Sequence, residues 1–453
     1  MLDPVAARHR PVDHRPRPAR TVFLGFAVAA VLGTLSLMHP AASTGQGGAT
    51  PLQALFTAVS ALCVTGLVTV DTATFWTPLG HVVIMALIQV GGFGVMTFAS
   101  VVGLMVVRKL SLRSTLTAAA EVKSLGLDDV RHLVRGVVRI SLLIEAVAAV
   151  ILTLRFALGY GESWPRALWL GVFHSVSSFN NAGFALFSDS LISFADDGII
   201  LLTLSSATVL GGLGFPVIMQ LWRYPATPRR WSMNTRLVLL MTPLLLALGT
   251  VYITAIEWTN PATLGALPPA QRLLNGLTMS VQTRTSGFNS VDVGAMDPAT
   301  WLGMDALMFI GGGPAGTAGG IKVTTIAVLF LLALGELRGA GAVTVAGKRL
   351  SRAVHRQAIT VVMLAAGLVL AATTVLMLLT DLALDQILFE VTSAFGTVGL
   401  STGITADLPG AAQLIIIALM FIGRLGPITA ATALALRPRT VLYELPKERP
   451  IIG

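Results

Sequence analysis

Four short segments of this chain each place a glycine at the end of an apolar stretch, and together they could bind a bare cation. The glycines are Gly66, Gly183, Gly287 and Gly399, which stand 117, 104 and 112 residues apart. Glycine permits left-handed backbone dihedrals that can turn carbonyl oxygens toward a common axis. Rings of such oxygens can replace the water shell of a monovalent cation. The spacing therefore indicates four copies of one unit and predicts a cation selectivity filter.

Three residues from each segment are predicted to line this filter through their backbone carbonyls. They are Val64, Thr65 and Gly66, then Asn181, Ala182 and Gly183, then Thr285, Ser286 and Gly287, and finally Thr397, Val398 and Gly399. A single glycine in a membrane helix is more often a packing residue. Four equivalent glycines in four matched segments favour the filter instead.

The composition excludes an ordinary soluble protein. Of 453 residues, 54% are apolar and 12% are charged, whereas soluble domains have about 25% charged residues. The net charge of +9 could suggest nucleic-acid binding, but 25 of the 31 Lys and Arg residues fall in five segments between apolar runs. That alternation follows the positive-inside rule. We expect a multi-pass membrane protein with both termini in the cytoplasm, lipid around it and no nucleic-acid partner.

Each repeat is predicted to contain an outward spanning helix, a half-helix that dips back, a filter strand and a second spanning helix. The half-helices are expected over 52–65, 166–182, 272–286 and 384–398, because such short segments cannot cross a core of about 30 Å. The spanning segments are expected over 22–38, 82–107, 133–158, 199–222, 237–256, 302–337 with an interruption, 358–379 and 411–436.

The expected fold is therefore all-α and integral to the membrane, with eight transmembrane helices and four re-entrant half-helices around one pseudo-fourfold pore. Residues 21–453 would form a single domain, with repeats at about 21–108, 132–223, 236–338 and 356–437. Residues 1–20 are rich in Arg, His and Pro and are expected to be a disordered cytoplasmic tail. The first apolar segment is long for a signal-peptide core of about 7 to 15 residues, so we expect a membrane helix there.

The third repeat contains a stretch that cannot be a helix. Residues 311–320 include six glycines and Pro314, and each costs about 1 or 3 kcal/mol relative to Ala in a helix interior. A broken helix at mid-membrane is typical of a binding site or a gate. The residues that would form such a binding site or gate are Gly311, Gly312, Gly313, Gly316, Thr317, Gly319, Gly320 and Lys322. The sequence leaves open whether Lys322 faces an inner vestibule or caps carbonyls.

Arg424 interrupts a second repeated pattern. Small-residue pairs at 91–92, 211–212 and 311–312 follow their filter glycines by 24 to 29 residues, and the fourth pair is Gly423-Arg424. An arginine inside a membrane costs at least about 2.5 to 3.5 kcal/mol, so it normally faces water or a partner. Two interpretations remain for Arg424: a salt bridge or helix cap within the protein, and a positive barrier below the filter.

Other polar residues near the filter are expected to support it. Arg284 should point behind the filter, since a cation in the permeation path would oppose its function, and Glu390 lies at the start of the fourth half-helix. Asn180, Asn181 and Asn289 are expected to brace the strands by hydrogen bonds. The single Cys63 excludes an intrachain disulfide and is expected to be a buried packing residue.

The residue patterns do not favour an enzyme. The seven His show no paired metal spacing, and GGGPAG lacks the following Lys-Ser/Thr of a phosphate-binding loop. We therefore expect no catalytic residues, no cofactor and no metal beyond the permeating ion. Any contribution from a nucleotide would have to come from another polypeptide.

Taken together, these residues resemble the Trk/Ktr/HKT superfamily of potassium transporters, and most closely the membrane subunit of the bacterial Ktr system. The resemblance rests on the four filter segments, on FIGGGPAGTAGGIKVTT from 309 to 325, on FIGRLGPITA from 421 to 430, and on the terminal PKERPIIG. It implies uptake of an ion across a bacterial plasma membrane. The implied ion is potassium, because in this family Gly at all four filter positions goes with potassium preference. Ser at the first position goes with sodium uptake in plant relatives.

The resemblance also implies a gate in the third repeat, a barrier role for Arg424 and a homodimer with Ile451-Ile452-Gly453 near the contact. It further implies a cytoplasmic ring of regulatory subunits that carries the nucleotide. The residues do not decide whether passage of the ion is purely electrodiffusive or assisted by sodium. They also leave open that the chain transports another monovalent cation, such as sodium or ammonium.

Overall fold

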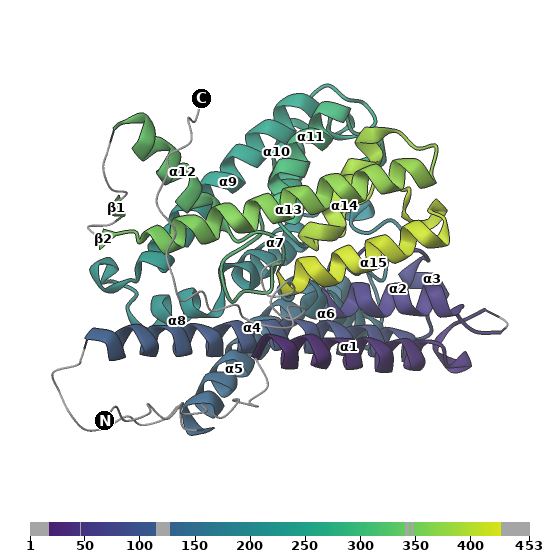
Figure 1. The fold of residues 1–453 in the computed structure, drawn as a ribbon. Helices are drawn as coiled ribbons and strands as arrows, with labels where there is room; N and C mark the ends of the chain where they lie inside the picture. The colour runs from purple at the N-terminus through teal and green to yellow at the C-terminus, as the bar shows by residue number, and fades with distance from the viewer. Residues whose placement is uncertain (1–17, 46, 115–126, 340–343, 346–347, 427–453) are drawn as a thin grey trace, which may run out of the picture.

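The computed structural model describes residues 18–45, 47–114, 127–339, 344–345 and 348–426. Almost all of the predicted basic tail, the end of the last spanning segment and the terminal Ile451-Ile452-Gly453 lie outside the described residues. The described part is helical (Figure 1) apart from one antiparallel strand pair, β1 (Thr344–Val345) and β2 (Lys348–Arg349). The all-α prediction is confirmed.

The four predicted half-helices are present with nearly the predicted bounds. They are α2 (Pro51–Leu62), α6 (Trp164–Phe179), α10 (Pro269–Thr283) and α14 (Leu384–Gly396). Three of them begin with proline in the first two positions, where the missing N–H would have no helical partner. Thr50 adds a capping box to α2 together with Gln53, so the start of this helix is well defined.

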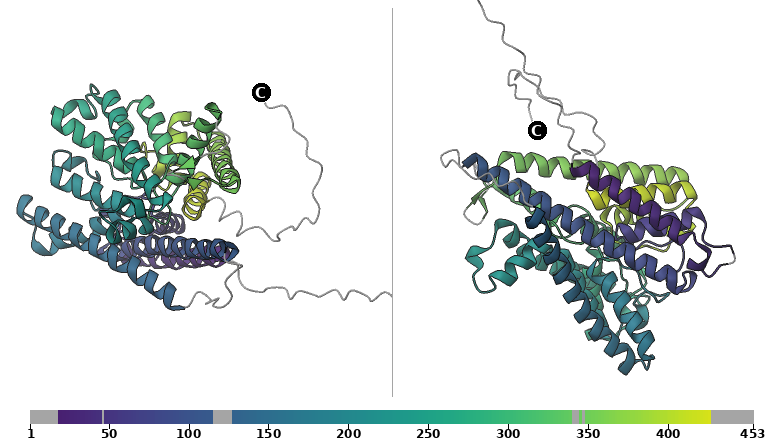
Figure 2. Two further views of the ribbon diagram at one scale, coloured as in Figure 1. Left: turned by 90° about the vertical axis from the view of Figure 1, so that its left-hand side faces the viewer. Right: turned by 90° about the horizontal axis from the view of Figure 1, so that it is seen from below.

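Further helices surround these half-helices. They are α1 (Pro18–Leu37), α4 (Pro78–Ser114), α5 (Leu127–Gly159), α7 (Gly198–Leu213), α8 (Phe215–Arg223), α9 (Met233–Glu257), α11 (Pro298–Phe309), α12 (Val323–Leu337), α13 (Arg352–Leu379) and α15 (Gly410–Leu425). Figures 1 and 2 show α1 and α4 side by side, whereas α5 diverges from them. A short helix, α3 (Thr72–Phe75), lies between α2 and α4.

Length and hydropathy alone identify three of the described helices as able to cross a membrane. They are α9, α13 and the part of α5 at Val134–Gly159, and the bent pair of α7 and α8 would make a fourth span. Several other apolar helices are shorter, among them Val22–Leu37 in α1 and Gly410–Leu425 in α15. The third repeat is interrupted as predicted, because α11 and α12 are separated by the loop at 310–322.

The second repeat differs from the prediction of one continuous helix over 199–222. The structure has two helices, α7 and α8, which are bent by 96° relative to each other. Gly214 joins them with φ of 95°, and Pro216 stands within the first turn of α8. A proline cannot continue the preceding hydrogen-bond ladder, and glycine is the residue that adopts a positive φ without a steric cost. The expectation of a continuous helix was therefore wrong.

The repeats are arranged in a closed cycle. The second helix of each repeat packs against the half-helix of the next: α4 on α6, α7 on α10, α11 on α14 and α15 on α2. Bulky residues anchor three of the half-helices, since Phe56, Phe173 and Phe389 are at most 1% exposed. The ends of the four half-helices are thereby brought to one place.

Candidate ion pore

The backbone following each half-helix adopts the same unusual conformation in all four repeats. After α2, Val64 has φ of 56° and Gly66 has φ of 93°. The equivalent pairs are Asn181 (61°) and Gly183 (70°), Thr285 (80°) and Gly287 (80°), and Thr397 (51°) and Gly399 (96°). A regular strand points successive groups to opposite faces. Alternation of left-handed residues with ordinary ones instead turns successive carbonyls to the same side.

The four strands meet in a closed ring, which we call the glycine ring. A Cβ atom added at any of its four glycines would collide with the carbonyl oxygen that precedes the glycine of a neighbouring repeat. These contacts run from Gly66 to Ala182, from Gly183 to Ser286, from Gly287 to Val398 and from Gly399 to Thr65. The last contact returns to the first repeat, so the four carbonyl oxygens converge around one axis.

The electrostatics around the glycine ring favour a cation. All four half-helices end at the ring, and helix C-termini carry about half a negative charge each. A cavity of about 420 Å³ lies over the ring, lined by its four glycines and by Asp71 and Asp189. Burial opposes ionisation of Asp71, but hydrogen bonds from Ser188, Thr74 and the Ala73 amide lower its pKa below the ordinary value. Asp71 is therefore ionised at neutral pH.

The loop at 310–322 fills the space left by the break between α7 and α8. Its amides at Gly313 and Thr317 donate to the carbonyls of Gly212 and Gly211 at distances of 2.7 and 3.1 Å. These carbonyls belong to the last turn of α7, where no helical partner exists. Non-helical backbone at membrane depth requires such partners, so the broken helix and the loop satisfy each other.

The same loop contacts the predicted filter strands of two repeats. A Cβ atom at Gly319 would collide with the hydroxyl of Thr397 in the fourth repeat. The Thr317 hydroxyl lies 3.2 Å from the carbonyl oxygen of Phe179 and 2.8 Å from the side-chain amide of Asn181 in the second repeat. The unwound loop therefore lies against the glycine ring on the side away from the cavity lined by Asp71 and Asp189.

Two cations hold successive carbonyls of this loop. The buried guanidinium of Arg424 donates to the Thr317 carbonyl and, at 3.1 Å, to the Gly91 carbonyl of α4. The Lys322 ammonium donates to the Ala318 carbonyl at 2.6 Å and lies 3.4 Å from that of Gly319. Within the described ranges, Arg424 forms no ion pair with a carboxylate. Both side chains thus cap carbonyls in this structure.

Arg284 points away from the axis of the glycine ring. Its guanidinium lies 3.2 Å from the Gly311 carbonyl and 3.5 Å from the Thr242 carbonyl of α9. Glu390 is buried and accepts hydrogen bonds from Ser401, at 2.7 Å, and from Thr405. Arg284 therefore binds backbone carbonyls of α9 and the loop, whereas Glu390 binds two side-chain hydroxyls in the segment that follows the fourth predicted filter strand. The Asn289 side chain donates to the Val291 carbonyl at 3.1 Å, and Cys63 is a free, buried thiol.

Comparison with known proteins identifies the family. The family model TrkH, described as a cation transport protein, matches residues 6–443. This chain belongs to the TrkH family of cation transport proteins. It is 37% identical to the Ktr system potassium uptake protein B of Vibrio alginolyticus over 99% of this chain and 97% of that protein. It is also 32% identical to the potassium/sodium uptake protein NtpJ of Enterococcus hirae, covering 98% of both chains.

The fold of this TrkH-family chain agrees with a solved structure. The potassium transporter TrkH from Vibrio parahaemolyticus superposes with a TM-score of 0.73, covering 94% of this chain and 87% of that chain at 18% sequence identity. The resemblance to the Trk/Ktr/HKT superfamily is confirmed. Membership of a cation transport family also makes this chain a transport protein, as expected, and not an enzyme.

Sequence reasoning missed a serine that braces the strand in three repeats of this TrkH-family chain. Ser60 donates to the Leu67 carbonyl at 2.7 Å and accepts from the Gly66 amide at 3.1 Å. Ser177 donates to the Phe184 carbonyl at 2.8 Å, and Ser393 accepts from the Gly399 amide at 3.1 Å. The signal was a serine six residues before the glycine. The third repeat has Val281 there.

The small-residue pairs of the second helices have a packing role in this structure. A Cβ atom at Gly91, Gly211 or Gly423 would collide with a carbonyl in the last turn of the half-helix in its own repeat, at Leu62, Phe179 or Phe395. Gly311 instead contacts the Gly319 carbonyl within the loop. The second helix can therefore approach the half-helix closely only where the first residue of the pair is glycine.

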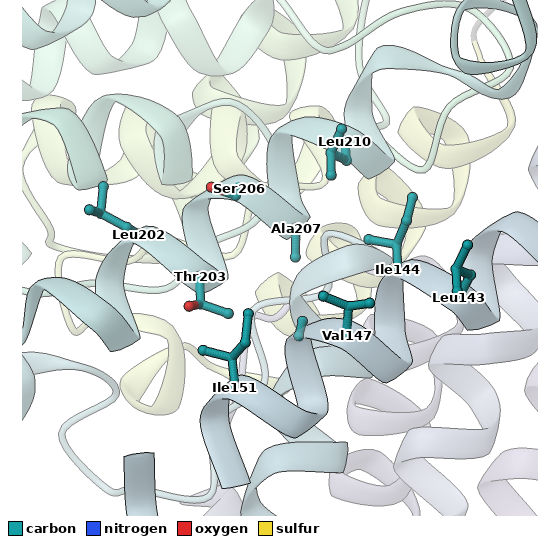
Figure 3. A pocket seen from close by; sticks show the side chains of 10 residues that line it. Leu143, Ile144, Val147, Ile151, Leu202, Thr203, Ser206, Ala207 and Leu210 are labelled. Atoms are coloured by element: carbon teal, nitrogen blue, oxygen red, sulfur yellow. The ribbon is translucent and has the colours of Figure 1, made fainter. Parts of the chain in front are cut away.

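A further cavity, of about 420 Å³, lies between α5 and α7 and is separate from the glycine ring. Figure 3 shows it bordered by apolar side chains such as Val147, Ile151 and Leu202. Val147 and Leu202 are 55% and 46% exposed, and no residue of the glycine ring lines the cavity. We interpret it as part of the lipid-facing surface of this TrkH-family protein.

Proposed function

We propose that this chain takes up potassium across a bacterial plasma membrane. The ion passes through the glycine ring, where the carbonyls of Thr65, Ala182, Ser286 and Val398 replace its water shell. The single observation that carries this proposal is the closed cycle of contacts between each glycine and a carbonyl of a neighbouring repeat. The relative from Vibrio alginolyticus is a potassium uptake protein, which supports the choice of ion.

Charge brings the ion to the ring and holds it there. Asp71 and Asp189 make the cavity above the ring negative and raise the local cation concentration. The half-helix ends add partial negative charge at the ring itself. In the proposed orientation this cavity faces outward and both termini lie in the cytoplasm, in keeping with the positive-inside rule.

The loop of Gly311, Gly312, Gly313, Gly316, Thr317, Gly319 and Gly320, with Lys322, is proposed as the gate. It lies against the ring, and Arg424 and Lys322 hold its carbonyls in that position. Arg424 also puts a positive charge beneath the ring. A ring of cytoplasmic regulatory subunits that bind nucleotide would control this gate, and a second copy of the chain would complete a homodimer.

Sodium is the second candidate for the transported ion. The Enterococcus hirae relative is named as a potassium/sodium uptake protein. Sodium could be transported itself or could assist potassium passage. Competition between the two ions during uptake separates these cases, since a transported competitor accumulates whereas an assisting ion raises the potassium flux.

The test of the proposed filter is Gly66→Ser in proteoliposomes, with potassium and sodium fluxes measured separately. A side chain at position 66 would collide with the Ala182 carbonyl, and the substituted residue would have to keep a positive φ. The backbone of the ring must therefore shift. We expect the potassium-to-sodium flux ratio to fall several-fold. Gly25→Ser is the matched control, because nothing lies within 4 Å of a Cβ at Gly25. If flux and ratio are both unaltered in Gly66→Ser, the filter assignment is wrong.

A further inference from the structure

Glu145 is a carboxylate at the middle of an apolar span. It lies in α5 within Val134–Gly159 and is 4% exposed. The other outward-going helices, α1, α9 and α13, have no charged residue in their middle thirds. A charged residue inside a membrane is costly and commonly marks a functional position. The outward-going helix of the second repeat therefore contains an ionisable group in its middle third, where the other three outward-going helices have none.

The partners of Glu145 are two side-chain amides from neighbouring helices. Gln89 of α4 donates to both carboxylate oxygens at 3.1 and 3.0 Å. Asn180 at the end of α6 donates to one of them at 3.0 Å. Asn180 also donates to the Gln89 side-chain oxygen at 3.0 Å, so the three side chains form a closed cluster. No ion pair to Glu145 occurs in the part of the chain that the structure describes.

This cluster reaches the filter through Asn180. Asn180 caps the C-terminus of α6 and is followed directly by the strand Asn181, Ala182 and Gly183. Its side chain is pressed against α4, since a Cβ at Gly92 would collide with the Asn180 amide oxygen. The position three residues before the ring glycine holds Cys63 in the first repeat and Arg284 in the third. The ring is thus fourfold in its backbone, but different side chains hold each strand.

We propose that Glu145 is a positioning residue for ion selectivity. Its carboxylate holds the Asn180 amide against α4 and thereby sets where the Ala182 carbonyl stands in the ring. Discrimination between potassium and sodium depends on the number and placement of such carbonyls. The inference rests on the proposed function of the ring as a potassium filter, and it adds a residue outside the filter that determines its specificity.

The test begins with Glu145→Gln. Two amide donors converge on the carboxylate, and a glutamine places its own NH₂ against at least one of them. We expect the potassium-to-sodium flux ratio in proteoliposomes to fall several-fold. Glu162→Gln is the matched control, because Glu162 lies outside the span and pairs with Arg166 on the surface. It should keep the wild-type ratio.

A double variant separates positioning from a merely structural role. Glu145→Gln combined with Gln89→Glu moves the carboxylate across the cluster and keeps an acceptor 3.0 Å from the Asn180 amide. We expect the double variant to recover most of the wild-type ratio. A ratio that stays at the single-variant value contradicts positioning through this cluster.

Two further controls keep each outcome informative. Should Glu145→Gln fail to fold, Glu145→Asp retains the charge but shortens the side chain. The aspartate variant is expected to lower the ratio, and a wild-type ratio in it overturns the proposal. Gly66→Ser is measured in the same assay. If Gly66→Ser changes the flux ratio but folded Glu145→Gln keeps the wild-type ratio, only the inference about Glu145 is refuted. If neither variant changes the flux ratio, the filter assignment itself is refuted.

Discussion

Removal of the Arg424 guanidinium should release the loop that lies against the glycine ring. Arg424 donates to the Thr317 carbonyl of the loop and to the Gly91 carbonyl of α4. A hydrogen bond to a charged group contributes about 1.5 to 3 kcal/mol. The bond to Gly91 links α15 to α4 and does not involve the loop. The bond to Thr317 exists only while the loop lies against the ring.

The size of the expected change in flux follows from the bond to Thr317 alone. Loss of about 1.5 to 3 kcal/mol from the closed position changes the ratio of closed to open loop by roughly 10- to 150-fold, since every 1.4 kcal/mol is tenfold. If the loop gates the pore, Arg424→Ala should raise the basal ion flux by a factor of up to this size. Arg424→Lys keeps a charge but loses the forked geometry, so its flux should be intermediate.

The assay is rubidium uptake into proteoliposomes that contain the chain without any cytoplasmic partner. Arg236→Ala is the matched control, because Arg236 also donates to two backbone carbonyls, those of Pro228 and Arg229, but near the surface. The control should leave the flux unchanged. An unchanged flux in folded Arg424→Ala would refute the reasoning, as would an equal increase in both variants.

Two more predictions concern stability. Gly214→Ala should lower the free energy of unfolding by about 1 to 3 kcal/mol, because a non-glycine residue at φ of 95° is strained and its Cβ meets the Pro314 carbonyl. A thermal melt equal to that of Gly25→Ala would contradict this. For Asp197, burial alone would raise the carboxyl pKa, but hydrogen bonds from Arg155, the Ile200 amide and Tyr160 lower it. Its stabilisation is therefore complete above the unfolded pKa of about 3.9 and is lost as pH falls through the lower folded value. The difference in melting temperature between wild type and Asp197→Asn should be largest near pH 7 and shrink below about pH 4, and a constant difference down to pH 3 would contradict the assignment.

The half-helices could be predicted because their signals are local. Each has a glycine at its end and a length too short to cross the membrane, and α2 and α14 end within three residues of the predicted bounds. The unwound loop was likewise predictable, because six glycines and a proline cannot form a helix interior. In both cases the information lies within about fifteen consecutive residues.

The break at Gly214 and the proposed role of Glu145 were not predicted, because both depend on contacts with segments distant in the sequence. The sequence Gly214-Phe215-Pro216 contains a helix-breaking signal, but the apolar run around it favoured one spanning helix. What stabilises the break is the loop about a hundred residues later, whose amides bind the freed carbonyls of α7. Glu145 is visible as one acid in an apolar span, but its partners come from α4 and α6. Contacts between repeats cannot be derived from spacing alone.

The most direct test of the potassium filter is to locate a heavy analogue of the ion. Crystals of the protein grown with rubidium or thallium should give anomalous density on the axis among the carbonyls of Thr65, Ala182, Ser286 and Val398. The density should weaken when the crystals are soaked in excess potassium, and less so in excess sodium. Absence of density at the glycine ring in crystals that bind the ion elsewhere would contradict the central claim.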